Sequence, residues 1–434
     1  MTTSILTRRA LLRGALIAGG GAAAYAGGLH SFGRLAQAQR FEPDGPDRYY
    51  VFCYFRGGWD VLLSLDPRDP VQFNDGRIRT TLIQPGYDRV EKPDANLVRV
   101  GEHSFGPYIG DLARRHMNRL AVIRGMSMDT LTHEAGRRRF LTGKPPAGLA
   151  ARGSNGSTWL AAQLGERHPI PQLSVDVESY NKGLPNFASS LRVNNVADLL
   201  RALRPSEPRL APRARELVDH RLAEAAACSR GQASESWGTA ENARLKAREM
   251  VLGGYADRFD FNTNTPEMVA LKAHYGINRV DASPEVQAAL AAQALTSGVA
   301  RVVSIQMAAG NLDTHFDEWE TDQGPIQERG FNAVARLVED LGSREYRRSG
   351  RSWLDHTTIV GFSEFSRTPM LNDRGGRDHH LGNSCFLLGG GVKGNQVIGR
   401  SSDVGMAPQP VDLQTGRPDP EGEVVRPEHV LQAL

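Results

Sequence analysis

The feature that most constrains this fold is a set of short, nearly continuous apolar runs that recur along the chain. The first run, residues 49–55, reads Tyr-Tyr-Val-Phe-Cys-Tyr-Phe and contains no charged residue. A strand with this pattern is covered on both faces, as in the parallel sheets of α/β proteins. Further runs of this kind follow at residues 120–123, 173–177, 301–307, 357–362 and 385–388. The runs therefore predict a sheet that is buried between two layers of helices.

Helical patterns separate these predicted strands, at residues 133–141, 284–297 and 326–341. Strands that alternate with helices predict an α/β fold, here a doubly wound, mostly parallel sheet with helices on both faces. The stretch from about 188 to 275 is instead rich in Ala, Arg, Glu and Leu, with a clear helix at 211–227. We interpret it as a helical insertion, and a solvated surface face is the alternative.

The first forty residues have the three parts of a secretion signal. Arg8 and Arg9 precede a glycine-rich apolar run at 14–28, and Ala-Gln-Ala follows at 36–38. Paired arginines indicate the twin-arginine route. A membrane anchor is the alternative, but the run is shorter than the roughly 20 apolar residues that spanning needs. We therefore expect a signal peptide at 1–38 and a mature domain at 39–434, exported folded by the twin-arginine machinery to the periplasm or beyond, with no membrane span after cleavage.

Removal of this signal changes the charge of the chain. The formal net charge is +3, and the segment 1–38 carries four arginines and no acid, so the mature protein has a charge of −1. A nearly neutral protein lacks the basic surface that nucleic-acid binding needs. Three cysteines permit one disulfide at most. Cys53 and Cys385 lie in apolar runs, so we expect them to be buried free thiols.

Acidic residues and histidines follow several of the predicted strands. In open α/β sheets, ligands bind at the carboxyl ends of the strands, and four separate segments bring such residues to this edge. The candidate metal ligands are Asp60, Asp313, His315, Glu364, Asp378, His379 and His380. Mixed carboxylate and imidazole ligands suit a divalent ion, such as zinc, manganese, calcium or magnesium. A polar network without metal is the alternative.

Thr132 is the candidate nucleophile, because it immediately precedes the predicted helix at 133–141. Free N–H groups at a helix start form a site for an oxyanion or a phosphate. The alternative is that this threonine only caps the helix. Other hydrolytic mechanisms lack their motifs, since the chain contains no Gly-x-Ser-x-Gly, no His-Glu-x-x-His and no Cys-x-x-Cys.

These segments together resemble a known family, the twin-arginine-exported domain of unknown function DUF 1501, which is grouped with the alkaline phosphatase-like and sulfatase-like superfamily. The matching stretches are Phe-Arg-Gly-Gly-Trp-Asp at 55–60, Asp-Thr-His at 313–315, Ser-Glu-Phe-Ser-Arg-Thr-Pro at 363–369, Gly-Arg-Asp-His-His at 376–380 and Gly-Gly-Gly-Val-Lys-Gly at 389–394. The resemblance implies one or two divalent metals at the carboxyl edge of the sheet. It also implies a Ser/Thr-type nucleophile that attacks phosphate or sulfate esters. By position, Thr132 matches that nucleophile, and we expect Arg367 to bind substrate.

The chain departs from the family pattern at three places. Phe365 stands where many superfamily members have a histidine, Trp59 stands where the family commonly has Asn, and Thr-His-Glu at 132–134 replaces the common Ser-His-Phe. The sequence thus predicts a metal-dependent hydrolase of phosphate or sulfate esters, with a small-molecule or polysaccharide substrate. In the polysaccharide case the insertion would shape an extended groove. The alternative is a non-catalytic exported binding or scaffold protein that retains the fold.

Overall fold

The chain folds around one large sheet. The structure, a computed structural model, describes residues 47–434 apart from 146, 148–149, 205–209 and 234, so the predicted signal at 1–38 lies outside the described residues. Eight strands form the sheet in the order β12-β4-β11-β8-β1-β7-β5-β6. Their bounds are β1 Tyr49–Tyr54, β4 Leu120–Ser127, β5 Ile170–Val175, β6 Leu191–Val193, β7 Ala300–Gln306, β8 Thr357–Phe362, β11 Gly382–Gly389 and β12 Gln396–Ile398.

The pairing of these strands confirms a mostly parallel sheet. The central strand β1 is parallel to both of its neighbours, with Tyr50 opposite Val302 of β7 and Thr358 of β8. β11 is the exception, because it runs antiparallel to β4 and to β8. The remaining pairs of this sheet, β12 with β4, β5 with β7 and β5 with β6, are parallel.

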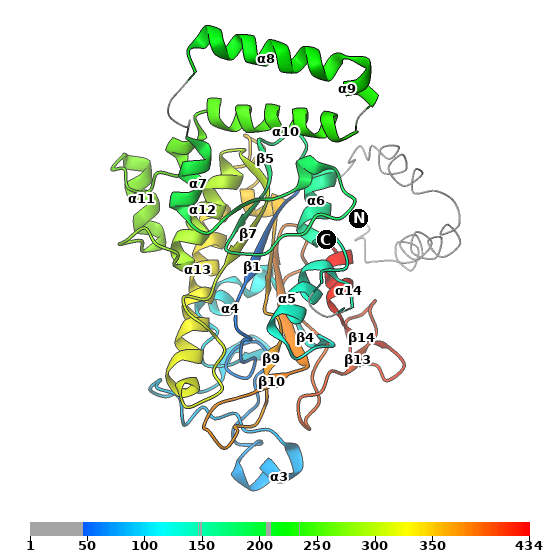
Figure 1. The fold of residues 1–434 in the computed structure, drawn as a ribbon. Coiled ribbons are helices and arrows are strands. Elements are labelled where there is room, and N and C mark those ends of the chain that lie inside the picture. Colours follow the sequence, from blue (N-terminus) through cyan, green and yellow to red (C-terminus); the bar gives the residue numbers. More distant parts are fainter. Residues whose placement is uncertain (1–46, 146, 148–149, 205–209, 234) are drawn as a thin grey trace, which may run out of the picture.

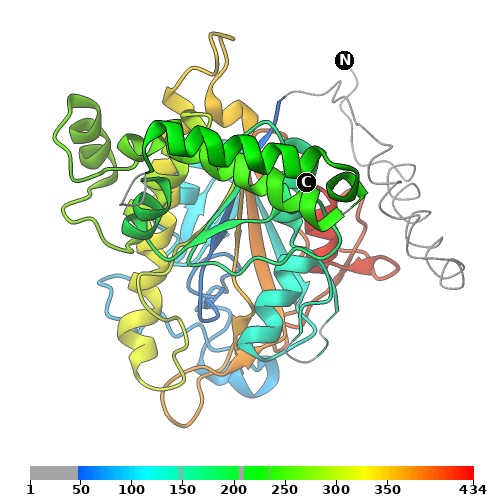
Figure 2. The ribbon, with the colours of Figure 1, turned by 45° about the horizontal axis from the view of Figure 1, so that its top comes forward.

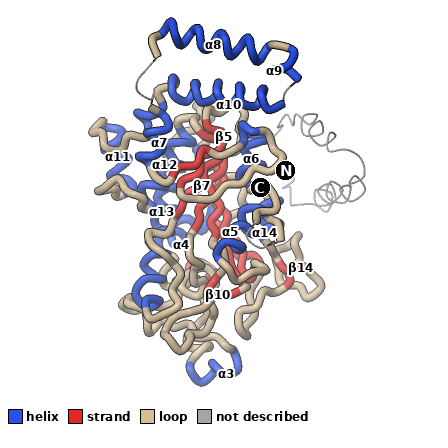
Figure 3. The backbone as a smooth tube through the Cα atoms, viewed as in Figure 1, coloured by secondary structure: helices blue, strands red, loops and turns tan. Residues whose placement is uncertain are grey.

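Helices cover both faces of the sheet, as Figures 1 and 3 show. One layer contains α4 (Gly110–His116), α12 (Pro284–Thr296) and α13 (Gly324–Ser343); the other contains α5 (His133–Thr142), α6 (Gly156–Leu164) and α14 (Pro427–Gln432). Strand β1 shows why its sequence is apolar throughout. Val51 and Cys53 belong to the hydrophobic core on the α12–α13 side, whereas Phe52 and Tyr54 pack in the core that includes Phe140 of α5.

The stretch from 188 to 275 is mainly helical. Its helices are α7 (Val196–Leu203), α8 (Pro212–Ala227), α9 (Ser229–Ala233), α10 (Glu235–Leu252) and α11 (Pro266–Tyr275). The segment also supplies β6, an edge strand of the main sheet. α7 buries Leu199 and Leu203 in the core, whereas α8 has no buried residue. Figure 1 shows α8 and α10 at the end of the sheet opposite β9 (Ser366–Arg367) and β10 (His379–His380), and Figure 2 shows these two helices, in green, lying across that end.

Shorter elements complete the described chain. They are η1 (Asp75–Arg77), α3 (Ile78–Thr81), β2 (Val98–Val100), β3 (His103–Phe105), η2 (Met117–Arg119), η3 (Asn186–Ala188), η4 (Tyr255–Arg258), η5 (Trp319–Gln323), η6 (Trp353–His356), β13 (Pro410–Val411) and β14 (Glu423–Val424). Cys53 and Cys385 are buried free thiols, as predicted, and Cys228 is an exposed one. Within the part of the chain that the structure describes, every helix is too short or too polar to cross a membrane.

Candidate metal centre

Three imidazole rings converge on one carboxylate beyond the carboxyl ends of β7 and β8. Oδ1 of Asp313 lies 3.1 Å from Nε2 of His133, 3.0 Å from Nε2 of His315 and 3.2 Å from Nε2 of His379. The ligand atoms of His133, Asp313 and His379 all lie within 4.8 Å of one another. Nε2 of His315 lies 2.9 Å from Nε2 of His379. We call these four residues the His–Asp cluster.

The outer nitrogen of each ring contacts a hydrogen-bond acceptor. The contacts are His133 Nδ1 to Glu364 Oε1 at 2.8 Å, His315 Nδ1 to Asp378 Oδ1 at 2.7 Å and His379 Nδ1 to the carbonyl oxygen of Leu131 at 2.6 Å. Ionised carboxylates and carbonyls only accept, so each Nδ1 donates, and the lone pair of a neutral ring lies on Nε2. Three such lone pairs and a carboxylate oxygen at this separation repel each other unless a metal ion lies between them or a proton occupies one of the rings. Rings oriented in this way from their outer nitrogen are typical of metal-binding histidines.

The pKa shifts in and beside the cluster favour the protonated form of His133 and the ionised forms of Asp313 and Glu364. Burial disfavours the charged form of His133, but its hydrogen bonds with Asp313 and Glu364 outweigh burial and raise its pKa to about 9. Burial likewise opposes ionisation of Asp313, yet hydrogen bonds from His133, His379 and Arg367 hold its pKa far below the usual range. The pKa of Glu364 is also lowered despite complete burial, chiefly because His133 donates to it. The site therefore favours an ionised carboxylate beside cations.

Two glycines after β1 allow the surrounding backbone to approach. Gly57 has φ +110°, and a Cβ there would lie 2.4 Å from the backbone nitrogen of Leu312. Its own N–H donates to Oε1 of Glu364 over 2.9 Å. Gly58 has φ +81°, and a Cβ there would lie 2.5 Å from the ring of Phe365. The Gly-Gly pair therefore lets the loop before Asp313 and the end of β8 close around the cluster.

Helix α5 brings His133 to the cluster through another close approach. A Cβ on Gly136 would lie 2.5 Å from the carbonyl oxygen of Glu364, so only glycine fits at this crossing. Thr132 occupies the N-cap position with extended backbone, φ −114° and ψ 140°, and its side chain forms no capping hydrogen bond. The residue is exposed. The alternative that Thr132 serves only as a cap therefore has no hydrogen bond to support it.

Arg367 and Phe365 form the buried side of the cluster. Nη2 of Arg367 donates to Oδ1 of Asp313 over 2.7 Å, and its Nε donates to the carbonyl of Gly58 over 3.0 Å. The Arg367 side chain is fully buried, so it holds Asp313 in place from within the protein. The Phe365 ring is centred 4.2 Å from the ring of His379 and 4.8 Å from that of His133. The position where a histidine was expected is thus an apolar wall.

Asp60 lies apart from this cluster, in a buried ion pair. Its Oδ2 is 3.0 Å from Nε of Arg377 and accepts from Nε1 of Trp319 over 2.9 Å. Its Oδ1 accepts from the N–H of Leu62 over 2.9 Å. These contacts occupy both carboxylate oxygens. The residue that follows the first strand therefore serves to join β1, η5 and the segment before β10.

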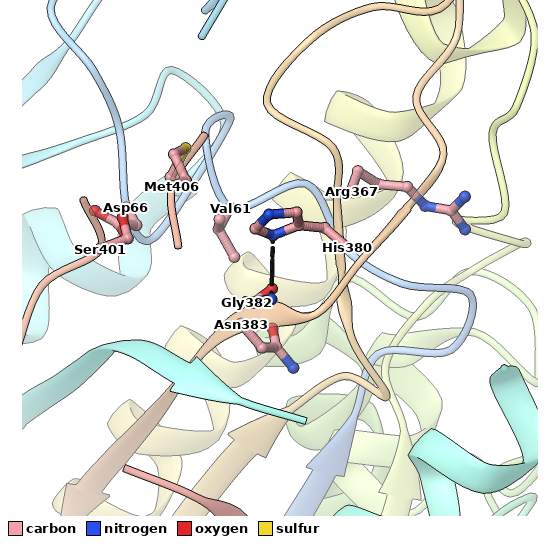
Figure 4. Close-up of a pocket in the computed structure, with 8 residues that line it drawn as sticks. All are labelled: Val61, Asp66, Arg367, His380, Gly382, Asn383, Ser401 and Met406. Carbon is pink, nitrogen blue, oxygen red and sulfur yellow. Dashed lines mark hydrogen bonds between the residues drawn. The ribbon is translucent and has the colours of Figure 1, made fainter. Parts of the chain in front are cut away.

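His380 points away from the cluster, although it neighbours His379. Figure 4 shows it in a small pocket lined by Asp66, Ser401 and Met406, among others. Its Nδ1 accepts from the N–H of Gly382 over 3.1 Å, and burial lowers its pKa. Adjacent residues of an extended strand face opposite ways, which is why the doublet divides between two environments.

The chain matches the family of proteins of unknown function DUF1501 over residues 49–415. It belongs to this family. No curated protein matches it significantly.

Two solved structures are similar to this DUF1501 protein, each at 10% sequence identity. One is a protein in the alkaline phosphatase superfamily from Vibrio parahaemolyticus, with a TM-score of 0.32 and coverage of 86% of this chain and 71% of that one. The other is Ps i-CgsB in complex with k-i-k-neocarrahexaose, with a TM-score of 0.34 and coverage of 85% and 70%. At these TM-scores the similarity adds nothing to the topology described above.

Of the residues that the sequence predicted as ligands, the DUF1501 structure brings Asp313, His315 and His379 together. Glu364 and Asp378 contact the outer nitrogens of the rings instead. The sequence reasoning missed His133, which it treated only as the first residue of a helix. The signal was present in the Thr-His-Glu stretch, since a histidine at the start of a helix after a strand lies at the edge where the other candidates gather. Among the described residues, His133, Asp313 and His379 are the one group of three or more with metal-binding geometry.

Proposed function

We propose that this DUF1501 protein is an exported, metal-dependent hydrolase of phosphate or sulfate esters. The observation that supports the proposal most is the convergence of three Nε2 atoms on one oxygen of Asp313 within 3.2 Å. Electron-rich atoms packed this closely fit a site built to hold a cation.

The donor set favours one kind of ion. His133, Asp313 and His379 would hold it, with His315 beside them as a further nitrogen donor. Imidazole nitrogens suit zinc and similar transition metals, whereas calcium and magnesium prefer oxygen ligands. When bound, such an ion supplies a Lewis acid that polarises an ester oxygen. Buried Arg367 supplies a second, fixed positive charge, because its Nη2 donates to the same Oδ1 of Asp313.

We assign the role of nucleophile to Thr132. Its neighbour Leu131 accepts the hydrogen bond from His379, and its other neighbour is His133 itself. Both neighbours of Thr132 in the chain therefore contact the cluster or belong to it. Thr132 also lies at the N-terminus of α5, where free N–H groups favour an anion.

The reaction would proceed in two displacements. First, Oγ1 of Thr132 bonds to the phosphorus or sulfur atom while the bond to the alcohol oxygen breaks, and the threonine proton passes through solvent to that oxygen. Water then displaces Thr132, which regains its proton, and phosphate or sulfate leaves. Because α8 and α10 lie at the far end of the sheet from β9 and β10 (Figure 1), we favour a small ester over a polysaccharide bound along the insertion.

The experiment is an assay of the mature protein with aryl phosphates and aryl sulfates, combined with elemental analysis. We expect about one ion of zinc or a similar transition metal per chain. We also expect hydrolysis of the ester, which Thr132→Ala should abolish without loss of the metal. His133→Ala should remove both. His220→Ala is the matched control, because this exposed histidine lies on α8. Metal without turnover in every assay would favour the non-catalytic scaffold, and absence of metal would contradict the proposal.

Export by the twin-arginine machinery is a separate part of the proposal, and it rests on the motif at 8–9. Replacing both residues, Arg8→Lys and Arg9→Lys, should retain the protein in the cytoplasm, since this route depends on the paired arginines. Cell fractionation with an antibody against the mature domain measures the outcome. Export of the doubly substituted chain at the normal level would contradict the proposed route.

A further inference from the structure

A second cluster of basic residues lines a small pocket at the other end of α5. Its charged lining residues are Arg138, Arg139, Lys144 and Arg152. Among the described residues that line it, none is acidic. Arg139 lies six residues after His133, which corresponds to about 9 Å along the helix axis. The pocket is therefore distinct from the His–Asp cluster.

Arg139, which lines this pocket, has one donor without a partner. The side chain is fully buried, its Nε and Nη2 bond to Asp129, and Nη2 also contacts Glu428 at 2.6 Å. Its Nη1 is buried and has no hydrogen-bond partner. A buried guanidinium N–H without an acceptor is costly. An acceptor supplied by a ligand would remove this cost.

The two exposed basic residues of the lining also carry uncompensated charge. Lys144 and Arg152 form no ion pair with any residue that the structure describes. Arg138 is partly balanced, since its Nε lies 3.6 Å from Glu178 and donates to the hydroxyl of Tyr180 over 2.9 Å. Arginine and lysine together are the side chains that proteins use to bind phosphate and sulfate groups.

We propose that this pocket binds a small tetrahedral oxyanion, a phosphate or sulfate group, through Arg139, Lys144 and Arg152. This site goes beyond the proposed hydrolase, because it needs neither the metal nor turnover. The group could come as a free inorganic anion or as part of an ester. The two sources share the same charged oxygens, and an organic group attached to the anion tells them apart.

The test is isothermal titration of the mature protein with inorganic phosphate, inorganic sulfate and phenylphosphonate. We expect binding that Lys144→Ala/Arg152→Ala weakens at least tenfold. The control Lys393→Ala/Arg114→Ala removes one exposed lysine and one exposed arginine elsewhere, and it should leave the affinity unchanged. Neither double variant changes the His–Asp cluster, so any anion bound there contributes equally to the affinities measured for both. Tighter binding of phenylphosphonate than of phosphate would identify an ester-borne group, and equal binding a free anion.

A conservative variant tests the buried donor directly. Arg139→Lys keeps a positive charge for Asp129 and Glu428 but loses Nη1, so the affinity for phosphate should fall about tenfold while thermal melting shows a folded protein. Equal affinity of wild type and Lys144→Ala/Arg152→Ala would overturn the proposal, as would absence of anion binding to wild type at 10 mM, roughly the limit for a built site. Because no step requires catalysis, failure of the hydrolase proposal leaves this result interpretable.

Discussion

At the scale of single residues, Glu364 orients a ring of the His–Asp cluster without belonging to the three residues that could hold a metal. Its Oε1 contacts His133 Nδ1 and accepts the N–H of Gly57. We predict that Glu364→Gln lowers metal affinity about 10- to 100-fold, because the ring loses the charged acceptor that fixes its orientation. Competition with a chromogenic chelator measures this affinity. Thr358→Val, on the same strand but bonded to the carbonyl of Gly390, is the control for disturbance of β8. An unchanged affinity in Glu364→Gln would contradict the role.

The sequence could place Glu364 at the edge of the sheet but could not assign this role. A residue that binds a metal and a residue that orients a metal-binding histidine lie on opposite sides of the same imidazole ring. Which of the two a residue becomes depends on contacts distant in sequence, such as Gly57 against Leu312 and Gly136 against Glu364. For the same reason Asp60, which the sequence predicted as a ligand, pairs with Arg377 instead. Residue types and strand ends predict the neighbourhood of a site, and tertiary packing selects its members.

His168 provides a residue-scale prediction for pH. Burial, with Arg301 nearby, lowers its pKa from 6.5 to about 4. Between pH 6.5 and pH 4, His168 is therefore protonated in the unfolded chain but neutral in the folded chain. The free energy of unfolding is thus highest above pH 6.5 and decreases as the pH falls to 4. We expect this group to account for about 2 kcal/mol of that loss. Urea denaturation at pH 7 and pH 4.5 should show a smaller difference for His168→Gln, and an identical difference would refute the assignment.

At the scale of elements, the apolar runs predicted the strands well because each is buried on both faces. They could not predict that β11 is antiparallel, since its apolar run resembles the others. The reason lies in the connection. Only 19 residues separate the end of β8 from the start of β11, and among the described elements there they form β9 and β10 rather than a crossover helix. A parallel return normally needs such a helix, so the chain turns back beside β8.

The crossing of α5 and the end of β8 makes a prediction at this scale. Gly136→Ala would place a Cβ 2.5 Å from a backbone oxygen, so the helix must shift, which costs about 1–3 kcal/mol and moves His133. Gly342→Ala is the matched control, because its Cβ would meet only Leu354 at an ordinary 3.8 Å. That variant should be neutral or stabilising by up to about 1 kcal/mol. Thermal melts and metal titrations of both variants decide the matter, and equal behaviour would show that the crossing tolerates a methyl group.

At the scale of the whole molecule, a metal in the His–Asp cluster would join parts of the chain that are far apart in sequence. His133 starts α5, Asp313 follows β7, and His379 lies in β10. The unfolded chain cannot hold these ligands together, so a bound ion stabilises only the folded state. With free metal at about 1,000 times the dissociation constant, the gain is about 4 kcal/mol. A chain of this size then melts about 5 °C higher with metal than without it.

Differential scanning calorimetry with and without a chelator measures this difference. His133→Ala should melt at the same temperature in both conditions, because one of the three ligands of the described group is gone. His220→Ala, on the outer helix α8, should keep the full shift. The comparison separates a metal that is part of the folded structure from one that binds weakly at the surface. If wild type and His133→Ala respond alike to the chelator, the cation that balances the three imidazoles and Asp313 is a proton, and the cluster is a hydrogen-bonded network rather than a metal centre.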